Sequence, residues 1–353
     1  MGRMKVVQVG VGGFGRHWVR VLRDSKDVRV AGLVDLRRDA IDAARQELGD
    51  AGVPGFESLT AALRAVAADA AVIVTPPERH RPLAEQAMRA GLHVITEKPM
   101  AATPADCASM LRTAAATGRV CVVSQNYRYR PELWTMAALV RRGAIGDIGQ
   151  VRLEFFKGQD FHGGFRHSMP YPLLIDMSIH HFDLIRFITG LDPVAVRGEA
   201  WNPPWSNYAG DCSSAVTFEM NNGARVLYNG SWCSKGAYCD WNGNWHIEGS
   251  KGCLTYASGQ VALHSVPALY TETRQRAVAL KPLKPDGQAR VLKDFTAAVR
   301  RGRRPPTDVR DNIRSVAMVF AAVEAVKTGR RVPVLDARMR AALAAAGRRD
   351  PGT

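Results

Sequence analysis

The stretch from Met4 to Asp35 constrains the fold of this chain more than any other part of the sequence. A short valine-rich run, Met4 to Val9, is followed by glycines at positions 10, 12 and 15 and then by a helix-like segment. A second apolar run, Val28 to Val34, ends at an acidic residue, Asp35. Short apolar runs that end at a glycine are typical of buried parallel strands. The stretch therefore predicts a strand–helix–strand unit with a glycine-rich turn.

The glycines of this turn fit the G-x-G-x-x-G pattern of dinucleotide-binding proteins. The first glycine allows a tight turn, the second lets the backbone approach a pyrophosphate, and the third lets the helix pack closely on the strand. The helix directs its N–H groups and the positive end of its dipole at that phosphate. The pattern alone also occurs in purely structural turns, but here strand, glycines, helix, second strand and terminal acid occur in order. We expect the turn to bind the cofactor through Gly10, Gly12, Gly13, Phe14 and Gly15.

Asp35 bears on which dinucleotide is bound. An acid roughly 20 residues past the glycines can accept hydrogen bonds from the adenosine ribose, and its charge repels a 2′-phosphate. NAD is therefore the predicted cofactor. Arg37 and Arg38 follow directly and can offset that repulsion, so NADP remains an alternative.

Beyond Asp35, strand-like and helix-like segments alternate as far as residue 125. This alternation predicts an α/β Rossmann domain over residues 1–125, with a doubly wound parallel sheet between two layers of helices. Ligands of such sheets bind at the carboxyl ends of the strands. The residues that follow the predicted strands are therefore further candidates for cofactor binding: Thr75, Pro76, Pro77, His80, Glu97, Lys98, Gln125 and Asn126.

Residues 126–335 are predicted to form an α+β domain that binds substrate. From about Gly146 onward, strand-like segments follow one another with few helices between them, which predicts a largely antiparallel open sheet. One helix, Pro172 to Thr189, interrupts them. Two late helices, 291–301 and 309–328, are expected to pack back on the first domain, and residues 336–353 form a tail.

The interrupting helix contains the strongest candidates for proton transfer. Asp176, His180 and Asp183 are spaced i, i+4 and i+7, which places them on one face of a regular helix. The plainer interpretation is a buried set of groups that hydrogen-bond one another. The sharper one is a general base, His180, held with Asp176 beside a reacting hydroxyl. His181 is expected to be mainly structural, and Asp183 to bond within the helix or to Arg186.

Lys98 also has two interpretations, because it follows a strand at the nucleotide end of the sheet. It is either a surface cation that caps the strand or a cation that faces the substrate hydroxyl. In the second case it lowers nearby pKa values and stabilises developing alkoxide charge.

Aromatic residues gather between residues 201 and 245, where five of the seven tryptophans lie. They suit stacking on a sugar ring or a buried subunit face, of which we favour the second. We therefore predict a homodimer or homotetramer that forms through the sheet of the second domain. Loop 161–166 is a candidate mobile substrate loop because its glycines permit hinge motion. The candidate substrate contacts are Tyr127, Arg128, Phe165, Arg166 and His181.

The formal net charge of +15 in 353 residues raises the question of a nucleic-acid or membrane partner. The arginines are scattered in small groups, mostly at predicted helix ends, and no basic stretch interleaved with aromatics is present. No apolar run approaches the roughly 20 residues of a membrane span, and no signal peptide precedes the first strand. The six cysteines show no C-x-x-C pair, which predicts reduced thiols in a cytoplasmic protein and no metal site.

Taken in order, the motifs resemble the glucose-fructose oxidoreductase / inositol dehydrogenase / MocA (Gfo/Idh/MocA) family across essentially the whole chain. The resemblance rests on the glycine turn, on 75–80 (Thr-Pro-Pro-Glu-Arg-His), on 97–99 (Glu-Lys-Pro), on 125–128 (Gln-Asn-Tyr-Arg) and on the Asp176…His180…Asp183 helix. It implies a Rossmann domain, an α+β domain whose sheet often forms the dimer face, and NAD or NADP as cofactor. It also implies that Lys98, Asp176 and His180 form the catalytic group.

The function that the resemblance implies is hydride transfer between a nicotinamide cofactor and a hydroxyl or keto carbon of a sugar, inositol or related polyol. The alternative is a non-catalytic dinucleotide-binding sensor of the same fold, which would not need all three of Lys98, Asp176 and His180. Two features depart from the family pattern: the stretch 168–172 has prolines in place of glycines, and Ser178 replaces a common glycine. We expect these departures to change the substrate pocket and the packing of the helix.

Overall fold

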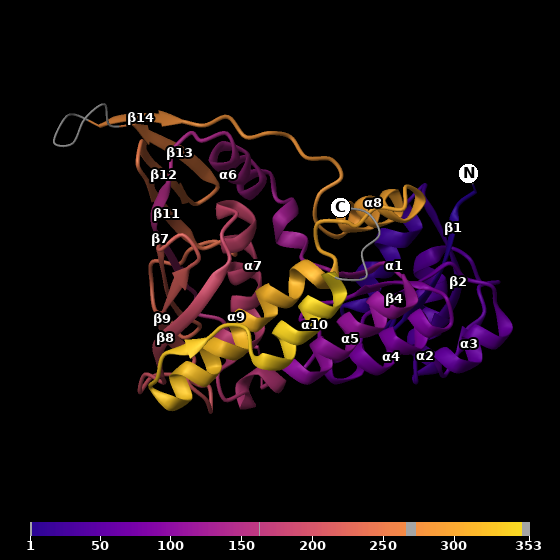
Figure 1. The fold of residues 1–353 in the computed structure, drawn as a ribbon. Helices are drawn as coiled ribbons and strands as arrows, with labels where there is room; N and C mark the ends of the chain where they lie inside the picture. Colours follow the sequence, from indigo (N-terminus) through magenta and orange to yellow (C-terminus); the bar gives the residue numbers. More distant parts are fainter. Residues whose placement is uncertain (1, 162, 266–272, 348–353) are drawn as a thin grey trace. The chain divides into compact units, whose positions relative to one another are not determined.

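A computed structural model describes residues 2–161, 163–265 and 273–347. The chain divides into two compact units (Figure 1). The first comprises residues 1–126, 284–313 and 337–353, and the second comprises residues 127–283 and 314–336. The segment 284–313 thus returns to the first unit, as do residues 337–347, where a tail was expected. Most of the helix 309–328, which was expected to pack on the first unit, belongs to the second. Among the described helices, none is long and apolar enough to cross a membrane.

The first unit contains a six-stranded parallel sheet in the order β3-β2-β1-β4-β5-β6. The chain starts in the middle of this sheet and winds outward in both directions, as in a doubly wound dinucleotide-binding fold. The predicted α/β architecture is therefore confirmed. Its strands are β1 Met4–Val9, β2 Val28–Val34, β3 Gly55–Phe56, β4 Ala70–Ile73, β5 His93–Thr96 and β6 Cys121–Val123.

Helices of the first unit form two groups. Because right-handed crossovers run outward from β1 in opposite directions, the two groups cover opposite faces of the sheet. One group brings α1 together with α2 and α8, and the other brings α4 together with α5 and α10 (Figure 1). The helices are α1 Gly15–Asp24, α2 Arg38–Leu48, α3 Leu59–Ala65, α4 Pro77–Arg89, α5 Pro104–Thr117, α8 Gly287–Arg300 and α10 Ala337–Gly347.

The ends of α5 show how local sequence sets these boundaries. Thr103 is the N-cap, and its hydroxyl accepts a hydrogen bond from the backbone N–H of Asp106 at 3.1 Å. Pro104 occupies the first helical position, where no N–H is needed. Gly118 ends the helix in the left-handed region, with φ of 68°. Each of these three positions thus has the residue type that its place in the helix favours.

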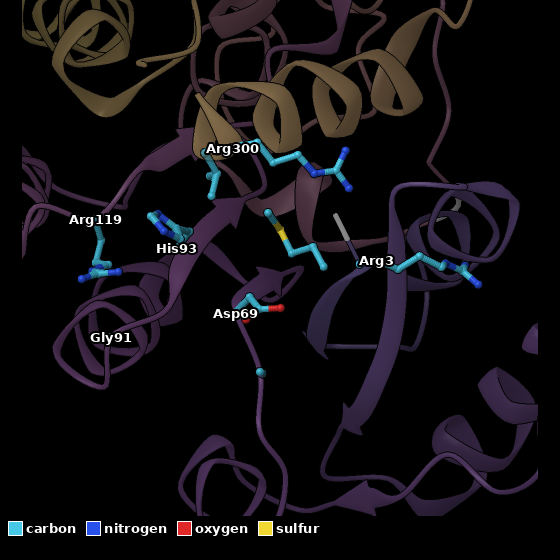
Figure 2. Close-up of a pocket in the computed structure, with 10 residues that line it drawn as sticks. Arg3, Asp69, Gly91, His93, Arg119 and Arg300 are labelled. Atoms are coloured by element: carbon cyan, nitrogen blue, oxygen red, sulfur yellow. The ribbon is translucent and has the colours of Figure 1, made fainter. Parts of the chain in front are cut away.

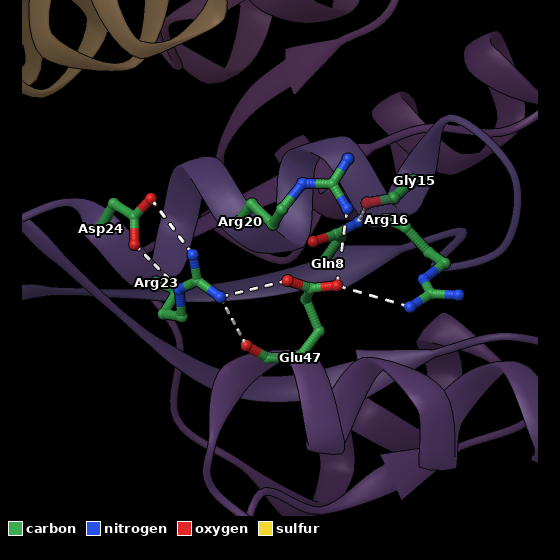
Figure 3. A network of polar contacts seen from close by, with 7 residues as sticks. All are labelled: Gln8, Gly15, Arg16, Arg20, Arg23, Asp24 and Glu47. Carbon is green, nitrogen blue, oxygen red and sulfur yellow. Dashed lines mark hydrogen bonds and ion pairs between the residues drawn. The ribbon is translucent and has the colours of Figure 1, made fainter.

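Helix α1 is tied to α2 by one carboxylate that meets three cations (Figure 3). Glu47 of α2 lies within 3.4 Å of the guanidinium groups of Arg16 and Arg20, and 3.1 Å from that of Arg23. On the sheet side, the Gln8 amide donates to the carbonyl of Gly15 at 2.8 Å. These contacts fix the start of α1, which follows the glycine turn.

The second unit contains a nine-stranded sheet in the order β14-β13-β12-β11-β7-β10-β9-β8-β15. Its pairs are antiparallel except for β7 with β10, so the predicted largely antiparallel sheet is confirmed. The strands are β7 Ile148–Phe156, β8 Pro193–Trp201, β9 Ser213–Met220, β10 Arg225–Ser231, β11 Asn244–Gly249, β12 Gly252–Ala257, β13 Gln260–Ser265, β14 Arg274–Ala277 and β15 Val332–Pro333.

One face of this sheet is covered by α6 Pro131–Arg141 and by α7 Ser178–Thr189 (Figure 1). Phe182 of α7 packs edge-on against Tyr228 of β10 and Phe218 of β9, with ring centroids 5.1 and 4.9 Å apart. Successive residues of a strand point to opposite faces. The alternate residues of β10, such as Leu227, therefore lie on the other face, which we call the outer face of the sheet.

The aromatic residues of this sheet correct a premise of the predicted subunit interface. Most of them face the helices and not the outer face, because they share the strand register of Tyr228. Tyr228 and Trp232 are each 1% exposed, Tyr256 is 2% exposed and Trp245 is 3% exposed. The exposed aromatics Trp205, Tyr238 and Trp241 lie outside the strands, and Trp201 of β8, 44% exposed, is on the outer face. An outer face rich in Trp and Tyr is thus wrong, and the predicted oligomer has to rest mainly on other features of that surface.

Candidate active site

The glycine turn has the shape that a dinucleotide requires. A Cβ atom on Gly10 would lie 2.0 Å from the carbonyl oxygen of Val74, and one on Gly15 would lie 2.3 Å from that of Gly10. Both positions therefore exclude any side chain. At Gly12, by contrast, a Cβ would meet nothing closer than 3.9 Å, so the space beside its backbone is open. A turn closed by two glycines and open at the third fits a bound pyrophosphate.

Asp35 reaches the same turn from the end of β2. Its Oδ2 accepts hydrogen bonds from the backbone N–H of Val11 at 2.9 Å and of Gly12 at 3.3 Å, and its Oδ1 accepts one from Arg37 at 3.1 Å. The Arg37 guanidinium is exposed and forms an ion pair with Asp39. The two cations expected to attract a 2′-phosphate, Arg37 and Arg38, are thus each paired with an exposed carboxylate, Asp39 and Glu57.

His80, a predicted cofactor contact, holds two strand ends together. Its ring is buried, with Nδ1 2.8 Å from the carbonyl oxygen of Pro99 and Nε2 2.8 Å from that of Thr75. Burial lowers the pKa of this ring, and the two carbonyls oppose that shift. The ring thus bonds to the segments that follow β4 and β5, between which Pro76 and Pro77 begin α4.

Glu97 follows β5 and Gln125 follows β6. The two side chains differ in whether their polar atoms have hydrogen-bond partners. Glu97 is buried, and its carboxylate accepts from the indole N–H of Trp18 at 2.7 Å and from the backbone of Lys98 at 3.1 Å. Burial raises the pKa of Glu97, and those hydrogen bonds oppose the rise. Gln125 is 1% exposed, and neither its Oε1 nor its Nε2 has a hydrogen-bond partner within the described residues. A buried amide of this kind requires a polar partner, which a bound ligand can supply.

In the second unit, the segment before α7 is not a regular helix. Residues Leu173–Met177 form a π-helical turn that runs directly into α7. The expectation of a regular helix from Asp176 onward is therefore wrong, because the wider turn shifts Asp176 relative to His180 and Asp183, which both belong to α7. Turns of this type are frequent at functional sites in helices.

Asp176 and the predicted substrate residue Arg166 form an ion pair. Arg166 Nε donates to Asp176 Oδ2 at 2.6 Å, and the two side chains are 29% and 15% exposed. The guanidinium also lies over the rings of Phe161 and Phe165, 4.7 and 4.6 Å from their centroids. His162, within the expected mobile loop, lies outside the described residues. Asp176 is thus held by a cation that itself rests on two aromatic rings.

His180 is positioned by a stack of planar groups. Its ring lies parallel to that of Tyr127, with centroids 4.1 Å apart and an interplanar angle of 13°. On the same Tyr127 ring lies the guanidinium of Arg130, 3.4 Å from the centroid, and Arg130 also donates to the amide oxygen of Asn242. Burial raises the pKa of Tyr127, against the opposing charge of Arg130, so its hydroxyl stays protonated at neutral pH.

Two other predicted substrate contacts are buried in structural networks. Arg128 forms a two-point ion pair with Asp183, both bonds 2.6 Å long, and Asp183 also accepts from Ser315 at 2.7 Å. This corrects the expectation that Asp183 bonds within its helix or to Arg186. His181 lies between the Tyr228 hydroxyl and the carbonyl of Trp241. Burial lowers its pKa to about 3, so its ring is uncharged at neutral pH.

Sequence inspection did not single out Arg130 or Ser315. Arg130 follows β6 and is close in the chain to Tyr127, a predicted substrate contact. That closeness could have indicated Arg130 from the sequence alone. Ser315 lies 132 residues from Asp183 and belongs to α9 Val309–Thr328, so only the fold brings the two together.

A pocket of about 500 Å³ lies in the first unit, at the end of its sheet opposite to the glycine turn (Figure 2). It is lined by residues at or near the starts of β1, β4 and β5, including Arg3, Asp69 and His93, together with Arg300 of α8. The guanidinium groups of Arg3 and Arg300 are bonded to Val28 and Asp27. Because ligands of parallel sheets bind at the carboxyl ends of the strands, we do not assign the cofactor to this pocket.

Comparisons with known proteins agree over nearly the whole chain. The model of an oxidoreductase family with an NAD-binding Rossmann fold (GFO_IDH_MocA) matches residues 4–125, and that of the GFO/IDH/MocA C-terminal domain matches residues 133–255. An uncharacterized protein, y4oX, of Sinorhizobium fredii is 31% identical over 94% of this chain and 96% of its own length. The D-apiose dehydrogenase of Paraburkholderia graminis is 27% identical over 94% of this chain and 89% of its own.

A solved structure shares the fold as well. It is an oxidoreductase from Agrobacterium radiobacter in complex with NAD+, L-tartaric acid and magnesium. The two structures superpose with a TM-score of 0.85 over 94% of this chain and 98% of the other, at 20% sequence identity.

Proposed function

Because the chain belongs to the GFO/IDH/MocA oxidoreductase family, we propose that it is a dehydrogenase or reductase that acts on a CH–OH group of a sugar, inositol or related polyol. The family supports the redox chemistry, and relatives named D-apiose dehydrogenase and inositol 2-dehydrogenase support the substrate class. The observation that carries the proposal is the buried His180 ring, held parallel to Tyr127 on the helix that follows Asp176.

The first unit supplies the cofactor site. The family description and the shape of the glycine turn both fit NAD, which supplies the hydride acceptor or donor when bound. The Asp35 carboxylate accepts hydrogen bonds from the ribose hydroxyls. The backbone at Gly12 and at the start of α1 binds the pyrophosphate. The unsatisfied amide of Gln125 is suited to bond the nicotinamide carboxamide.

Three side chains are proposed to act on the substrate hydroxyl. His180 accepts its proton in the oxidation direction and returns a proton in reduction. Lys98 places a positive charge where negative charge develops on the oxygen. Asp176, anchored by Arg166, orients the substrate or the His180 ring.

NAD is proposed as the preferred dinucleotide. The carboxylate of Asp35 lies at the turn, and Arg37 and Arg38 pair with Asp39 and Glu57. Titration of the purified protein with NADH and NADPH, followed by cofactor fluorescence, tests this preference. Tighter binding of NADPH would contradict it.

The activity itself is tested with a panel of polyols. The panel contains D-apiose, other aldoses, myo-inositol and sugar acids, each supplied with NAD, and NADH formation is followed by absorbance. We expect steady turnover with at least one member and none in a His180→Asn variant. If NADH binds tightly while no polyol supports turnover in either direction, the sensor function becomes the better account of the fold.

A further inference from the structure

Two cysteines of the second unit meet at the end of its sheet. Cys212 directly precedes β9, and Cys233 follows β10 by two residues. These strands pair so that Ser213 lies opposite Ser231. The Sγ atoms of Cys212 and Cys233 are 2.8 Å apart, although the two residues come from different strands. This separation is close to the range in which a sulfur–sulfur bond forms with only a small movement of either side chain.

The backbones of both cysteines are held in place. The carbonyl of Cys212 accepts a hydrogen bond from the N–H of Trp232 at 3.0 Å, which extends the strand pairing by one residue. The carbonyl of Cys233 accepts one from the indole of Trp205 at 2.9 Å, and its backbone forms a bridge with Gly158. The short distance between the sulfurs is thus maintained by the sheet and its neighbouring loop.

The two thiols differ in their surroundings. Cys212 is fully buried, with Asn202 Oδ1 and Ser206 Oγ each 3.3 Å from its sulfur. Burial raises the pKa of Cys212, as does the neighbouring sulfur. Cys233 is only partly buried, and the Ser231 hydroxyl lies 3.4 Å from its sulfur. Cys233 is therefore the thiol that a small oxidant in solution can reach.

We propose that Cys212 and Cys233 form a reversible intramolecular disulfide when the protein meets hydrogen peroxide. The sulfur of Cys233 attacks one peroxide oxygen, which breaks the O–O bond, releases water and leaves a sulfenic acid. The sulfur of Cys212 then attacks the sulfenic sulfur, and a second water leaves as the S–S bond forms. In total two thiols and one hydrogen peroxide give one disulfide and two waters, and an added dithiol reverses the change by thiol–disulfide exchange.

The Cys212–Cys233 disulfide would restrain the segment between β8 and β9, which packs against the residues that follow Arg166. Residues between β8 and β9 bond to the chain ahead of Asp176, through Ala209 N–H to the His167 carbonyl and Asp211 N–H to the Pro170 carbonyl, both at 2.8 Å. The rings of Tyr208 and His167 stack with centroids 4.9 Å apart. A covalent link at Cys212 therefore limits the movement of a segment next to the proposed substrate residues. The disulfide itself does not depend on the proposed activity.

Peptide mapping of the full chain tests the proposal. The reduced protein is treated with hydrogen peroxide, blocked with N-ethylmaleimide and digested with trypsin, which cleaves at Arg225 between the two cysteines. We expect a linked pair of peptides 198–225 and 226–235, two hydrogens lighter than their sum, and a fall of two in the number of alkylatable thiols. Dithiothreitol should restore both thiols.

Matched variants locate the effect. Cys212→Ser and Cys233→Ser should each abolish the linked peptide, whereas Cys253→Ser, at the other partly buried thiol, should leave its yield unchanged. Three results would overturn the proposal: no linked peptide, a link between two chains, or conversion of Cys233 to sulfinic acid in the native protein without a link to Cys212. The mapping of the native chain decides this even if a variant folds poorly.

Discussion

At the scale of single residues, the proposed mechanism makes His180 and Lys98 necessary for chemistry and dispensable for cofactor binding. His180→Asn removes an imidazole base, and Lys98→Met removes a charge while it keeps the length of the side chain. We expect each change to lower kcat by about 10² or more. The Kd for NADH should stay within a few-fold, because the glycine turn and Asp35 hold the dinucleotide. Steady-state kinetics and NADH fluorescence measure the two quantities.

The double variant supplies a further check on these roles. Residues that act on the same oxygen give non-additive effects, so the combined loss in kcat should be smaller than the product of the two single losses. Near-native turnover by both single variants with a proven substrate would show that other residues do the chemistry.

We expect the aromatic ring of Tyr127 to position the His180 imidazole, and its hydroxyl to be unnecessary for this role. Tyr127→Phe keeps the ring between His180 and Arg130, whereas Tyr127→Ala removes it. An aromatic stacking pair is worth about 0.5–1.5 kcal/mol, which corresponds to a loss in kcat of up to roughly tenfold in the alanine variant. The phenylalanine variant should retain most of the activity. The pH profile of kcat should shift in Tyr127→Ala but not in Tyr127→Phe, since only the former frees the imidazole to reorient. Equal losses in both variants would point to the hydroxyl.

At the scale of elements, the glycine turn allows a comparison of two identical substitutions a few residues apart. Gly12→Ala meets open space, so we expect the thermal midpoint of unfolding to be nearly unchanged while NADH binding is lost or greatly weakened. Gly15→Ala places a Cβ against the carbonyl of Gly10, so it should lower the thermal midpoint by several degrees, on the scale of overpacking. Calorimetry and fluorescence titration separate the two effects. A Gly12→Ala variant that binds NADH normally would contradict the assigned pyrophosphate position.

Sequence reasoning predicted elements well where the signal was local. The bounds of α9, Val309–Thr328, agree with the expected helix at both ends, and the cap of α5 at Thr103 follows from its side chain and Pro104. The π-helical turn Leu173–Met177 was missed because a regular period of 3.6 was assumed across it. Helix α6 was not predicted, although Pro131 marks its first turn.

The candidate site was only partly predictable, because many of its contacts join residues that are far apart in the chain. Sequence motifs identify which residues are chemically capable, such as the glycines, Asp35 and His180. They do not reveal which of them are already satisfied by partners far away in the chain. Arg128 was a plausible substrate contact until its partner Asp183, 55 residues on, was found in the structure. The ring of Tyr127 became a positioning group only when its distances to His180 and Arg130 were known.

At the scale of the whole molecule, the predicted homodimer or homotetramer now depends on the outer face of the second unit's sheet. No helix of the described residues in that unit covers this face in Figure 1, and β10, which neighbours the central strand β7, exposes 38% of Leu227. The surrounding exposed positions include both cations and anions, among them Arg197 and Glu199 on β8. A face on which exposed apolar side chains such as Leu227 lie among charges of both signs can complement itself across a two-fold axis.

A charge in place of Leu227 should therefore prevent assembly through that face. We expect the native protein to show at least twice the mass of one chain by light scattering at micromolar concentration, and Leu227→Arg to shift it to a single chain mass. The substitution would bury an unpaired charge in the interface. The free energy needed to desolvate that charge exceeds the binding free energy that the contact provides. Leu280→Arg is the control, because Leu280 is similarly exposed at 37% but lies outside the strands. A native monomer would rule out the oligomer, and a Leu227→Arg variant of unchanged mass would place the contact on another surface.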